Sequence, residues 1–365
     1  MRAATGTEAM PVLQGARGRV SWIDAAKGLG IVLIVLGHIT SVETPSAPYV
    51  FIYAFHVPLF FFVSGLTLKP GREPFGAMLQ SKFRTLLVPY LCYALLGYVF
   101  YIVGYGVAHA LGLRIEQFNY GPWHPLAGVF FGTLGDGNLV NTPVWFIIAL
   151  FCTFVIGYAI NTHIRSEVLR WTIIALLALT GYLASRQLKL PWSLASALVG
   201  LVFFQAGHLH AKRFGLESLS RRTLWPLLVV TLPISLFSYL NGFVSLADME
   251  LGHPALYALF AFSGLYLTIA LVQLLGQHTQ WLVRLGQWSM AIMVIHMLII
   301  KTAKVALAAL LHTNIAQIEA SWLPSLGVLL IVVALLIPSV WFMERFLPFT
   351  LGKSRTSAGK AAALP

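Results

Sequence analysis

The stretch DAAKGLGIVLIVLGH, residues 24–38, places an acid, a lysine and a histidine in a run that is otherwise apolar. With its neighbours it forms a run over residues 20–41, and an α-helix of about 20 residues can cross the hydrocarbon core of a membrane. Asp24 and Lys27 are three positions apart, so they are neighbours on such a helix. Lys27 and His38 share a face about 16 Å apart along the axis, because eleven residues make close to three turns. One stripe of a predicted membrane helix therefore carries polar groups at two depths.

The composition indicates that lipid surrounds most of the chain. The 365 residues are 58% hydrophobic and only 10% charged, and the mean hydropathy is +0.80, whereas soluble domains average about 25% charged residues. Further apolar runs follow the first, at residues 49–68, 86–108, 143–161, 168–185, 192–210, 224–240, 254–275, 288–311 and 323–346. We therefore predict an all-α integral membrane protein, a bundle of about ten transmembrane helices within residues 20–347. A cytoplasmic segment at 1–19 precedes the bundle, and a basic, disordered cytoplasmic tail at 348–365 follows it.

The distribution of basic residues predicts the orientation in the membrane. If the amino terminus is cytoplasmic, 19 of the 24 lysines and arginines fall on the cytoplasmic side, as the positive-inside rule requires. The opposite side then holds only Arg114, Arg186, Lys189, Lys301 and Lys304. Both termini are therefore expected in the cytoplasm, with the first helix kept as an uncleaved anchor. Topology and anionic lipid headgroups account for the net charge of +12, so no nucleic-acid partner is expected.

Three histidines lie in or beside these apolar runs. His56, in FHVPLFFFVSG (55–65), enters the second helix at about the depth of His38, and His296 lies in the middle of the ninth segment. A structural hydrogen bond between helices explains His38 alone equally well, but two imidazoles at one depth on consecutive helices favour a site. The histidines lack the i, i+4 spacing of a metal site. Cys92 and Cys152 lie inside apolar runs, so neither a disulfide nor a metal is expected.

The first two helices resemble the start of the acyltransferase 3 family of bacterial membrane proteins, within it most closely the fucose 4-O-acetylase-like branch. The segments that carry the resemblance are WIDAAKGLGIVLIVLGH and FIYAFHVPLFFFVSG. Lys27 and His38 match the family's first-helix motif, a basic residue, ten intervening residues and a histidine. SKFRTLLVPYL (81–91), NTPVWFIIALF (141–151) and LGQWSMAIMVIH (285–296) resemble later family segments. The likeness thus covers about residues 20–346.

The resemblance implies transfer of an acyl group, usually acetyl, from cytoplasmic acyl-CoA to a hydroxyl of an extracytoplasmic or lipid-linked glycan. The family's histidine corresponds to His38. A neutral imidazole, with a pKa near about 6.5, can act as the general base that deprotonates a sugar hydroxyl, or it can accept the acyl group itself. His56 would orient the hydroxyl or polarise the carbonyl, and Asp24 and Lys27 would lie at the cytoplasmic mouth. The expected location is the bacterial inner membrane.

The donor and acceptor contacts follow from the same resemblance. A basic cluster suits the phosphates of CoA, although the positive-inside bias explains the same charges; its members are Lys69, Arg72, Lys82 and Arg84. Some relatives have two arginines three apart here, whereas this chain has serine at position 81. Acceptor contacts are expected from Asn141, Trp145, Asp248 and His296. Expected partners are membrane lipids and a glycan or glycolipid, with a homo-oligomer or polysaccharide-assembly proteins as further possibilities.

A membrane transporter is the alternative interpretation. Ionisable residues within membrane helices mark substrate or proton paths by default, and such a path could be lined by Lys27, His38, His296, Lys301 and Lys304. Many transporters contain inverted repeats with helices broken at matching positions. No such repeat is evident in this sequence, which favours the enzyme.

Overall fold

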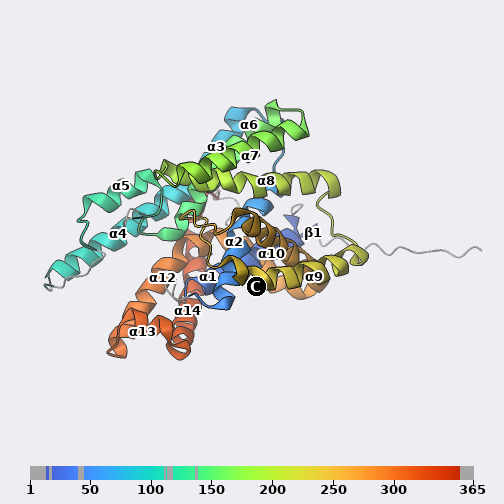
Figure 1. Ribbon diagram of the computed structural model, residues 1–365. Helices are drawn as coiled ribbons and strands as arrows, with labels where there is room; N and C mark the ends of the chain where they lie inside the picture. Colours follow the sequence, from blue (N-terminus) through green and yellow to red (C-terminus); the bar gives the residue numbers. More distant parts are fainter. Residues whose placement is uncertain are drawn as a thin grey trace, which may run out of the picture.

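The computed structural model describes residues 14–15, 19–39, 45–110, 112, 118–135 and 139–353. Helices make up most of this part of the chain (Figure 1). Strands occur there only as the two-residue antiparallel pair β1 (Gln14–Gly15) and β2 (Arg19–Val20). The rest of the predicted segment at 1–19 lies outside the described residues, as does the predicted tail beyond residue 353.

Nine helices within the described ranges are long and apolar enough to cross a membrane. Four are single elements: α2 (Ala47–Leu66), α7 (Glu167–Ala184), α12 (Ser289–Leu310) and α14 (Trp322–Phe346). Three add a short 3-10 turn to a long helix: η3 (Thr142–Val144) with α6 (Trp145–His163), η4 (Pro191–Ser193) with α8 (Leu194–Phe214), and η5 (Phe237–Asn241) with α9 (Arg221–Leu236). The first predicted span is α1 (Ser21–Gly37), whose 17 residues give about 26 Å, slightly less than a hydrocarbon core. The predicted all-helical, multi-pass membrane fold is confirmed, and its orientation stays a prediction.

The remaining two spans each join two α-helices through a short turn. The first is a 36-residue run of α3 (Phe75–Lys82), the π-helical turn η1 (Phe83–Leu87) and α4 (Val88–Ala110). The sequence predicted this helix to begin at residue 86, because apolar patterning reveals only the part of a helix that lies in lipid. The helix begins at Phe75 instead, so Lys82 and Arg84 lie on the helix and not in a loop. The second combines α10 (Pro254–Leu275), η6 (Gly276–Thr279) and α11 (Gln280–Gln287).

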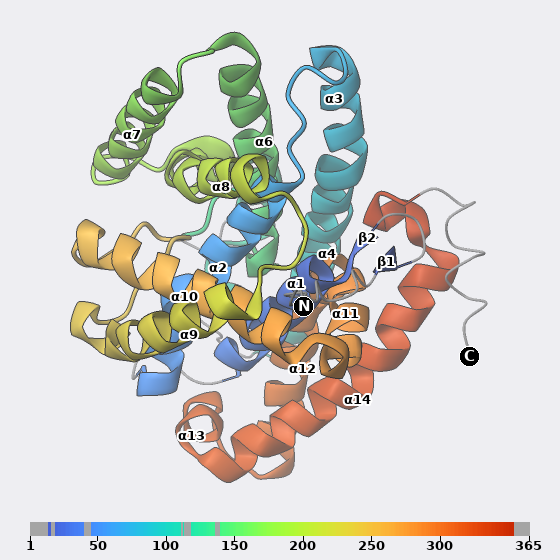
Figure 2. The same cartoon turned by 90° about the vertical axis from the view of Figure 1, so that its right-hand side faces the viewer.

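Helix α1 lies at the centre of the bundle, surrounded by α2, α10, α11 and α12 (Figure 2). Its closest neighbour is α11, and glycines make this approach possible. A Cβ atom on Gly28 would lie 1.9 Å from the Leu282 carbonyl oxygen, and one on Gly286 would lie 1.8 Å from the Asp24 carbonyl oxygen. Small residues let membrane helices pack backbone against backbone. The amino-terminal half of α1 is therefore fixed in place by α11.

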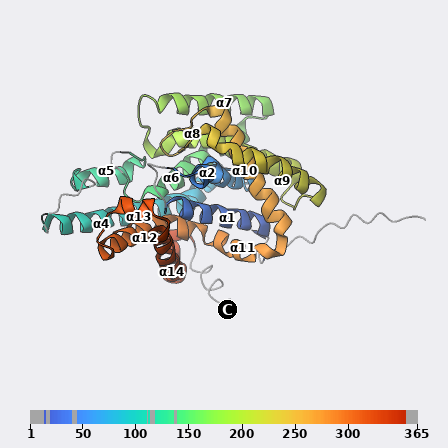
Figure 3. The ribbon, with the colours of Figure 1, turned by 60° about the horizontal axis from the view of Figure 1, so that its bottom comes forward.

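Burial separates inner from outer helices. The most apolar parts of the spans that contain α2 and α6 are 78% and 83% buried inside the protein. The corresponding parts of the α7 and α9 spans are only 17% and 22% buried. Figure 3 shows α7 and α9 at the periphery and α1 and α2 inside. Lipid is the solvent that suits the exposed apolar faces of the outer helices. The inner helices α1, α2 and α6 therefore direct most of their side chains at other parts of the protein.

Further short helices lie outside these spans: α5 (Trp123–Phe131), α13 (Ile315–Ala320) and η7 (Pro348–Leu351). Helix η7 lies within residues 348–365, which the sequence predicted to be a disordered tail. Thr350 is hydrogen-bonded to the Tyr93 hydroxyl at 2.7 Å, Leu351 is buried, and Lys353 forms an ion pair with Glu344 at 2.5 Å. These contacts extend the folded part of the chain to residue 353.

Candidate active site

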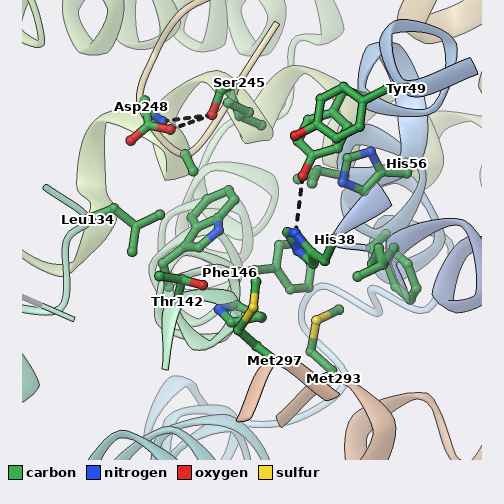
Figure 4. Close-up of a pocket in the computed structure, with 18 of the residues that line it drawn as sticks. His38, Tyr49, His56, Leu134, Thr142, Phe146, Ser245, Asp248, Met293 and Met297 are labelled. Atoms are coloured by element: carbon green, nitrogen blue, oxygen red, sulfur yellow. Dashed lines mark hydrogen bonds between the residues drawn. The ribbon is translucent and has the colours of Figure 1, made fainter. Parts of the chain in front are cut away.

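A cavity of about 230 Å³ lies at the carboxyl end of α1. Its walls come from α1, the first half of α2, η3 with the start of α6, the loop at 243–248 and α12 (Figure 4). The polar groups facing this space include His38, His56 and Asp248, and most of the remaining wall is aromatic or aliphatic. We call this space the His38 cavity. Chain segments far apart in the sequence thus converge on the histidine that ends the opening stretch.

His38 is the C-cap residue of α1, and its ring is held from two sides. Its Nδ1 is hydrogen-bonded to the Tyr53 hydroxyl at 3.1 Å. On the other side the ring stacks on His296, with centroids 5.3 Å apart and planes inclined by 23°. Tyr53 comes from α2 and His296 from α12, so three helices determine the position of one imidazole.

The tautomers of the other two histidines follow from their backbone contacts. His56 Nδ1 lies 2.8 Å from the Ile52 carbonyl oxygen, and His296 Nδ1 lies 3.0 Å from the carbonyl oxygens of Ile292 and Met293. Because a carbonyl only accepts hydrogen bonds, each Nδ1 carries the proton and each Nε2 keeps its lone pair. His56 lines the cavity, whereas His296 lies behind His38 and does not. The buried Nε2 of His296 has no hydrogen-bond partner among the described residues.

Aromatic rings beside the histidines and one carboxylate form further parts of the wall. Tyr49 stacks on Tyr53 with ring centroids 4.2 Å apart, and Phe243 lies 5.4 Å from Tyr53. Asp248 accepts a hydrogen bond of 2.7 Å from the Ser245 hydroxyl. Flat apolar faces beside a hydrogen-bonding carboxylate match the two kinds of surface on a sugar ring, its C–H faces and its hydroxyl rim.

The predicted acceptor residues Trp145 and Asn141 differ in position. Trp145 lines the cavity, as Asp248 does. Asn141 is fully buried and does not line the cavity; its amide nitrogen donates to the carbonyl oxygens of Tyr93 and Val294 at 3.1 and 2.8 Å. These bonds join the start of η3 to α4 and α12. Asn141 therefore supports the wall of the cavity from behind.

A second cavity, of about 370 Å³, is lined by Lys69, Arg72 and Lys82 together with Glu73, Phe154 and Tyr158. We call it the Lys82 cavity. The Lys82 ammonium lies 3.7 Å from the centroid of the Phe154 ring, a cation–π contact. The Tyr158 hydroxyl donates to the Glu73 carbonyl, which connects α6 to the loop between α2 and α3. Three of the four basic residues predicted to bind CoA thus come together.

The fourth, Arg84, does not join them. Its side chain is exposed, and it does not line the Lys82 cavity. The helical segment that begins at Phe75 explains this placement, because Lys82 and Arg84 occupy different faces of one helix. Arg84, which the family resemblance suggested as a CoA contact, therefore lies outside the Lys82 cavity.

Asp24 and Lys27 form an ion pair of 2.5 Å on α1. Asp24 is buried, its backbone lies against Gly286 of α11, and neither residue lines the His38 cavity or the Lys82 cavity. A buried carboxylate needs such a partner to remain charged. The pair stands at the amino end of α1, away from the histidine cluster at its carboxyl end.

Sequence reasoning missed Tyr49 and Tyr53, although a signal for them existed. Positions 49, 53 and 56 are spaced by four and three residues, which places both tyrosines and His56 on one face of α2. It also missed Tyr158, for which the sequence carries no signal beyond an aromatic residue in an apolar run. Within the described residues, no group of three or more histidine, cysteine, aspartate or glutamate side chains could hold a metal ion.

Comparison with known protein families gives one match. The model of the acyltransferase domain of the acyltransferase 3 family matches residues 20–344. Neither a curated protein nor a solved structure matches the chain. The matched residues include every helix that lines the two cavities, from α1 to α12. The chain belongs to the acyltransferase 3 family and is a multi-pass membrane acyltransferase.

Proposed function

We propose that this protein transfers an acyl group, acetyl in the simplest case, from acyl-CoA to a hydroxyl of an extracytoplasmic or lipid-linked glycan. The observation that carries the proposal is the His38 cavity, where His38 and His56 face one space beside an aromatic wall. The location that fits these substrates is the bacterial inner membrane. The family match supports acyl transfer and gives no support to a transporter.

The donor would bind at the Lys82 cavity. Lys69, Arg72 and Lys82 supply positive charge on one side of it, and charge-assisted hydrogen bonds are the strong contacts that phosphates make. Lys82 is held by Phe154, whereas Glu73 partly offsets the positive charge. The diphosphate of CoA fits this charge pattern, with its acyl-bearing arm directed into the protein.

The acceptor would bind in the His38 cavity. A sugar ring could lie against Tyr49, Tyr53 and Phe243, with Asp248 accepting a hydrogen bond from one of its hydroxyls. Such a pose places another hydroxyl beside the imidazoles. The glycan class rests on this combination of an aromatic wall and a carboxylate, together with the family resemblance.

The transfer itself needs a base. When Nδ1 of His38 donates to the Tyr53 oxygen, Nε2 of His38 keeps a lone pair for the acceptor proton. The acceptor oxygen then forms a bond to the thioester carbonyl carbon, the carbon–sulfur bond breaks, and the CoA thiolate takes up the proton from the imidazolium. His56, whose Nε2 also keeps its lone pair, would orient the attacking hydroxyl. A route through an acylated histidine gives the same products.

The two cavities are close enough for one substrate to reach both. Along α6, Phe146 lines the first cavity and Phe154 the second, and eight residues of helix correspond to about 12 Å. The flexible arm of an acyl-CoA can span such a distance, so the acyl group could reach the histidines while the phosphates stay at the lysines.

The test uses purified protein in lipid nanodiscs with acetyl-CoA labelled in its acetyl group and a panel of p-nitrophenyl glycosides. We expect label in at least one glycoside and release of an equal amount of free CoA thiol. Labelled glycoside without equal CoA release, or no labelled glycoside with acetyl-, propionyl- or succinyl-CoA, contradicts the proposal. Uptake of a glycoside into sealed vesicles without acylation would favour the transporter.

A further inference from the structure

The carboxyl end of α1 is held by a lysine from α12. The Lys304 ammonium donates to the His38 carbonyl oxygen at 3.1 Å and to Oε1 of Glu319 at 2.6 Å. Lys304 is 9% exposed and Glu319, on the short helix α13, is 22% exposed. One ion pair, in which Lys304 is buried and Glu319 half-buried, therefore connects α12 and α13 to the residue whose ring faces the cavity.

The position of this contact has a physical reason. The last carbonyls of a helix have no partner within the helix, and a cation near them is favoured by the helix dipole. His38 is the C-cap residue of α1, so its carbonyl is one of these groups. Holding the carbonyl oxygen fixes the Cα atom of His38, and with it the direction of the imidazole. Tyr53 and His296 contact the ring, but Lys304 holds the backbone that carries it.

Glu319 is needed for Lys304 to act in this way. An ammonium group buried among apolar side chains is costly unless a negative charge lies next to it. The Glu319 carboxylate provides that charge at 2.6 Å. The ion pair therefore holds the Lys304 ammonium beside the His38 carbonyl oxygen.

A second buried lysine on the same helix provides a contrast. Lys301 lies one turn before Lys304, and its ammonium donates to the Val140 carbonyl oxygen at 2.9 Å. Val140 precedes η3, on another wall of the cavity. The two lysines are alike in chemistry but hold different segments, so only Lys304 acts on α1.

We propose that the Lys304–Glu319 ion pair is a positioning element that holds His38 in its reactive place. The proposal rests on the proposed function, because it assigns the pair a role in catalysis through His38. Lys304 does not line the cavity, so it is a positioning residue and not a catalytic one.

The first test measures steady-state acetyl transfer by Lys304→Met and Lys304→Arg. We expect kcat of Lys304→Met to fall by about tenfold to a hundredfold, the size of loss that a displacement of about 1 Å causes. The KM for acetyl-CoA should change by less than about twofold, because the Lys82 cavity is untouched. Lys304→Arg, which keeps the charge and the donor, should recover most of the activity. A rise in the KM for acetyl-CoA with kcat unchanged would overturn the proposal.

The second test does not need activity. Diethyl pyrocarbonate acylates accessible imidazoles, and peptide mass spectrometry can follow His38 alone. We expect Lys304→Met and Glu319→Gln to change the modification rate of His38 severalfold, and Lys353→Met, at a lysine that lines neither cavity, to leave it unchanged. Equal rates in all variants would overturn the positioning role even if wild-type protein transfers no acyl group, a result that would by itself contradict only the proposed function.

Two controls separate positioning from general instability. Lys353→Met removes a Lys–Glu pair of similar length, 2.5 Å to Glu344, near the carboxyl end of α14. We expect it to leave kcat and the His38 rate unchanged. The double substitution of Lys304 and Glu319 by Met removes both charges, which is often neutral for stability. It should melt near the wild-type temperature yet show the low kcat of Lys304→Met; wild-type kcat in this folded variant would overturn the proposal.

Discussion

The His38 cavity and the Lys82 cavity lie on the same two helices, α2 and α6, but their walls differ in chemistry. The first brings imidazoles and aromatic rings together and has no lysine or arginine in its wall, whereas the second has Lys69, Arg72 and Lys82. Imidazoles suit proton transfer near neutral pH, and fixed cations suit anion binding. On the proposed function, this difference would place acyl transfer and donor binding near different ends of α2.

Packed aromatic side chains separate the two cavities. Phe61 of α2 is fully buried, and its ring lies 5.1 Å from that of Phe146 of α6. The ring of Phe154, one wall of the Lys82 cavity, lies 4.9 Å from that of Phe204. Cores of this kind exclude water. On the proposed function, an acyl arm that reaches the histidines must move these rings apart, and the packed core around it keeps water away from the thioester.

The largest expected effect comes from removing the imidazole at the chemical end. We expect His38→Ala to lower kcat by about a thousandfold, within the range that a general base contributes. The KM for acetyl-CoA should stay near the wild-type value, because the Lys82 cavity does not include His38. Single-turnover and steady-state transfer to a p-nitrophenyl glycoside measure both constants.

His163→Ala is the matched control for this prediction. His163 lies at the exposed carboxyl end of α6 and lines neither cavity, so its removal should leave transfer unchanged. A His38→Ala variant with wild-type kcat would contradict the base assignment. If both variants lost activity equally, the loss would reflect folding and not chemistry.

Much of the fold and part of the site could be predicted from the sequence. Apolar runs revealed the spans because lipid requires long apolar helices, and the depth of His38 and His56 placed both in one cavity. Three of the four basic residues line one cavity, whereas Arg84 does not, because its position depends on where the helix begins. The pattern of apolar residues shows the part of a helix that lies in lipid, and it does not show where the helix begins outside the lipid.

Contacts between distant segments could not be predicted in this way. Lys304 meets His38 across 266 positions of the chain, and Asn141 meets Val294 across 153. Nothing in the local sequence shows that Lys304 faces α1 and not lipid. Asn141 stands beside a family-like segment, which suggested substrate contact, but its amide joins helices instead. Tertiary packing determines both outcomes.

An intermediate effect is expected at the basic end. Arg72→Ala should raise the KM for acetyl-CoA by about tenfold, because a hydrogen bond to a charged group is worth about 1.5 kcal/mol or more and about 1.4 kcal/mol corresponds to tenfold. The value of kcat should change little. Arg84→Ala should have a smaller effect on KM, since its exposed side chain does not line the cavity. Calorimetric titration of each variant in nanodiscs with CoA measures the loss of CoA affinity that corresponds to each rise in KM. A larger loss in Arg84→Ala than in Arg72→Ala would move the donor phosphates out of the Lys82 cavity.

The smallest expected effect concerns the acceptor wall of the His38 cavity. Asp248 is exposed at its rim and is held by the Ser245 hydroxyl at 2.7 Å, so Asp248→Asn keeps the shape of the side chain and removes its charge. The KM for the glycoside acceptor should rise by about threefold, as expected for one exposed hydrogen bond worth about 0.5–1 kcal/mol, while the KM for acetyl-CoA stays constant. Glu250→Gln, an exposed neighbour that does not line the cavity, is the control.

Because the two cavities share no residue, a substitution at the rim of one should leave binding at the other intact. A change in the KM for acetyl-CoA in Asp248→Asn would show that the two ends of the bundle are coupled and would break the separation of chemistry from donor binding.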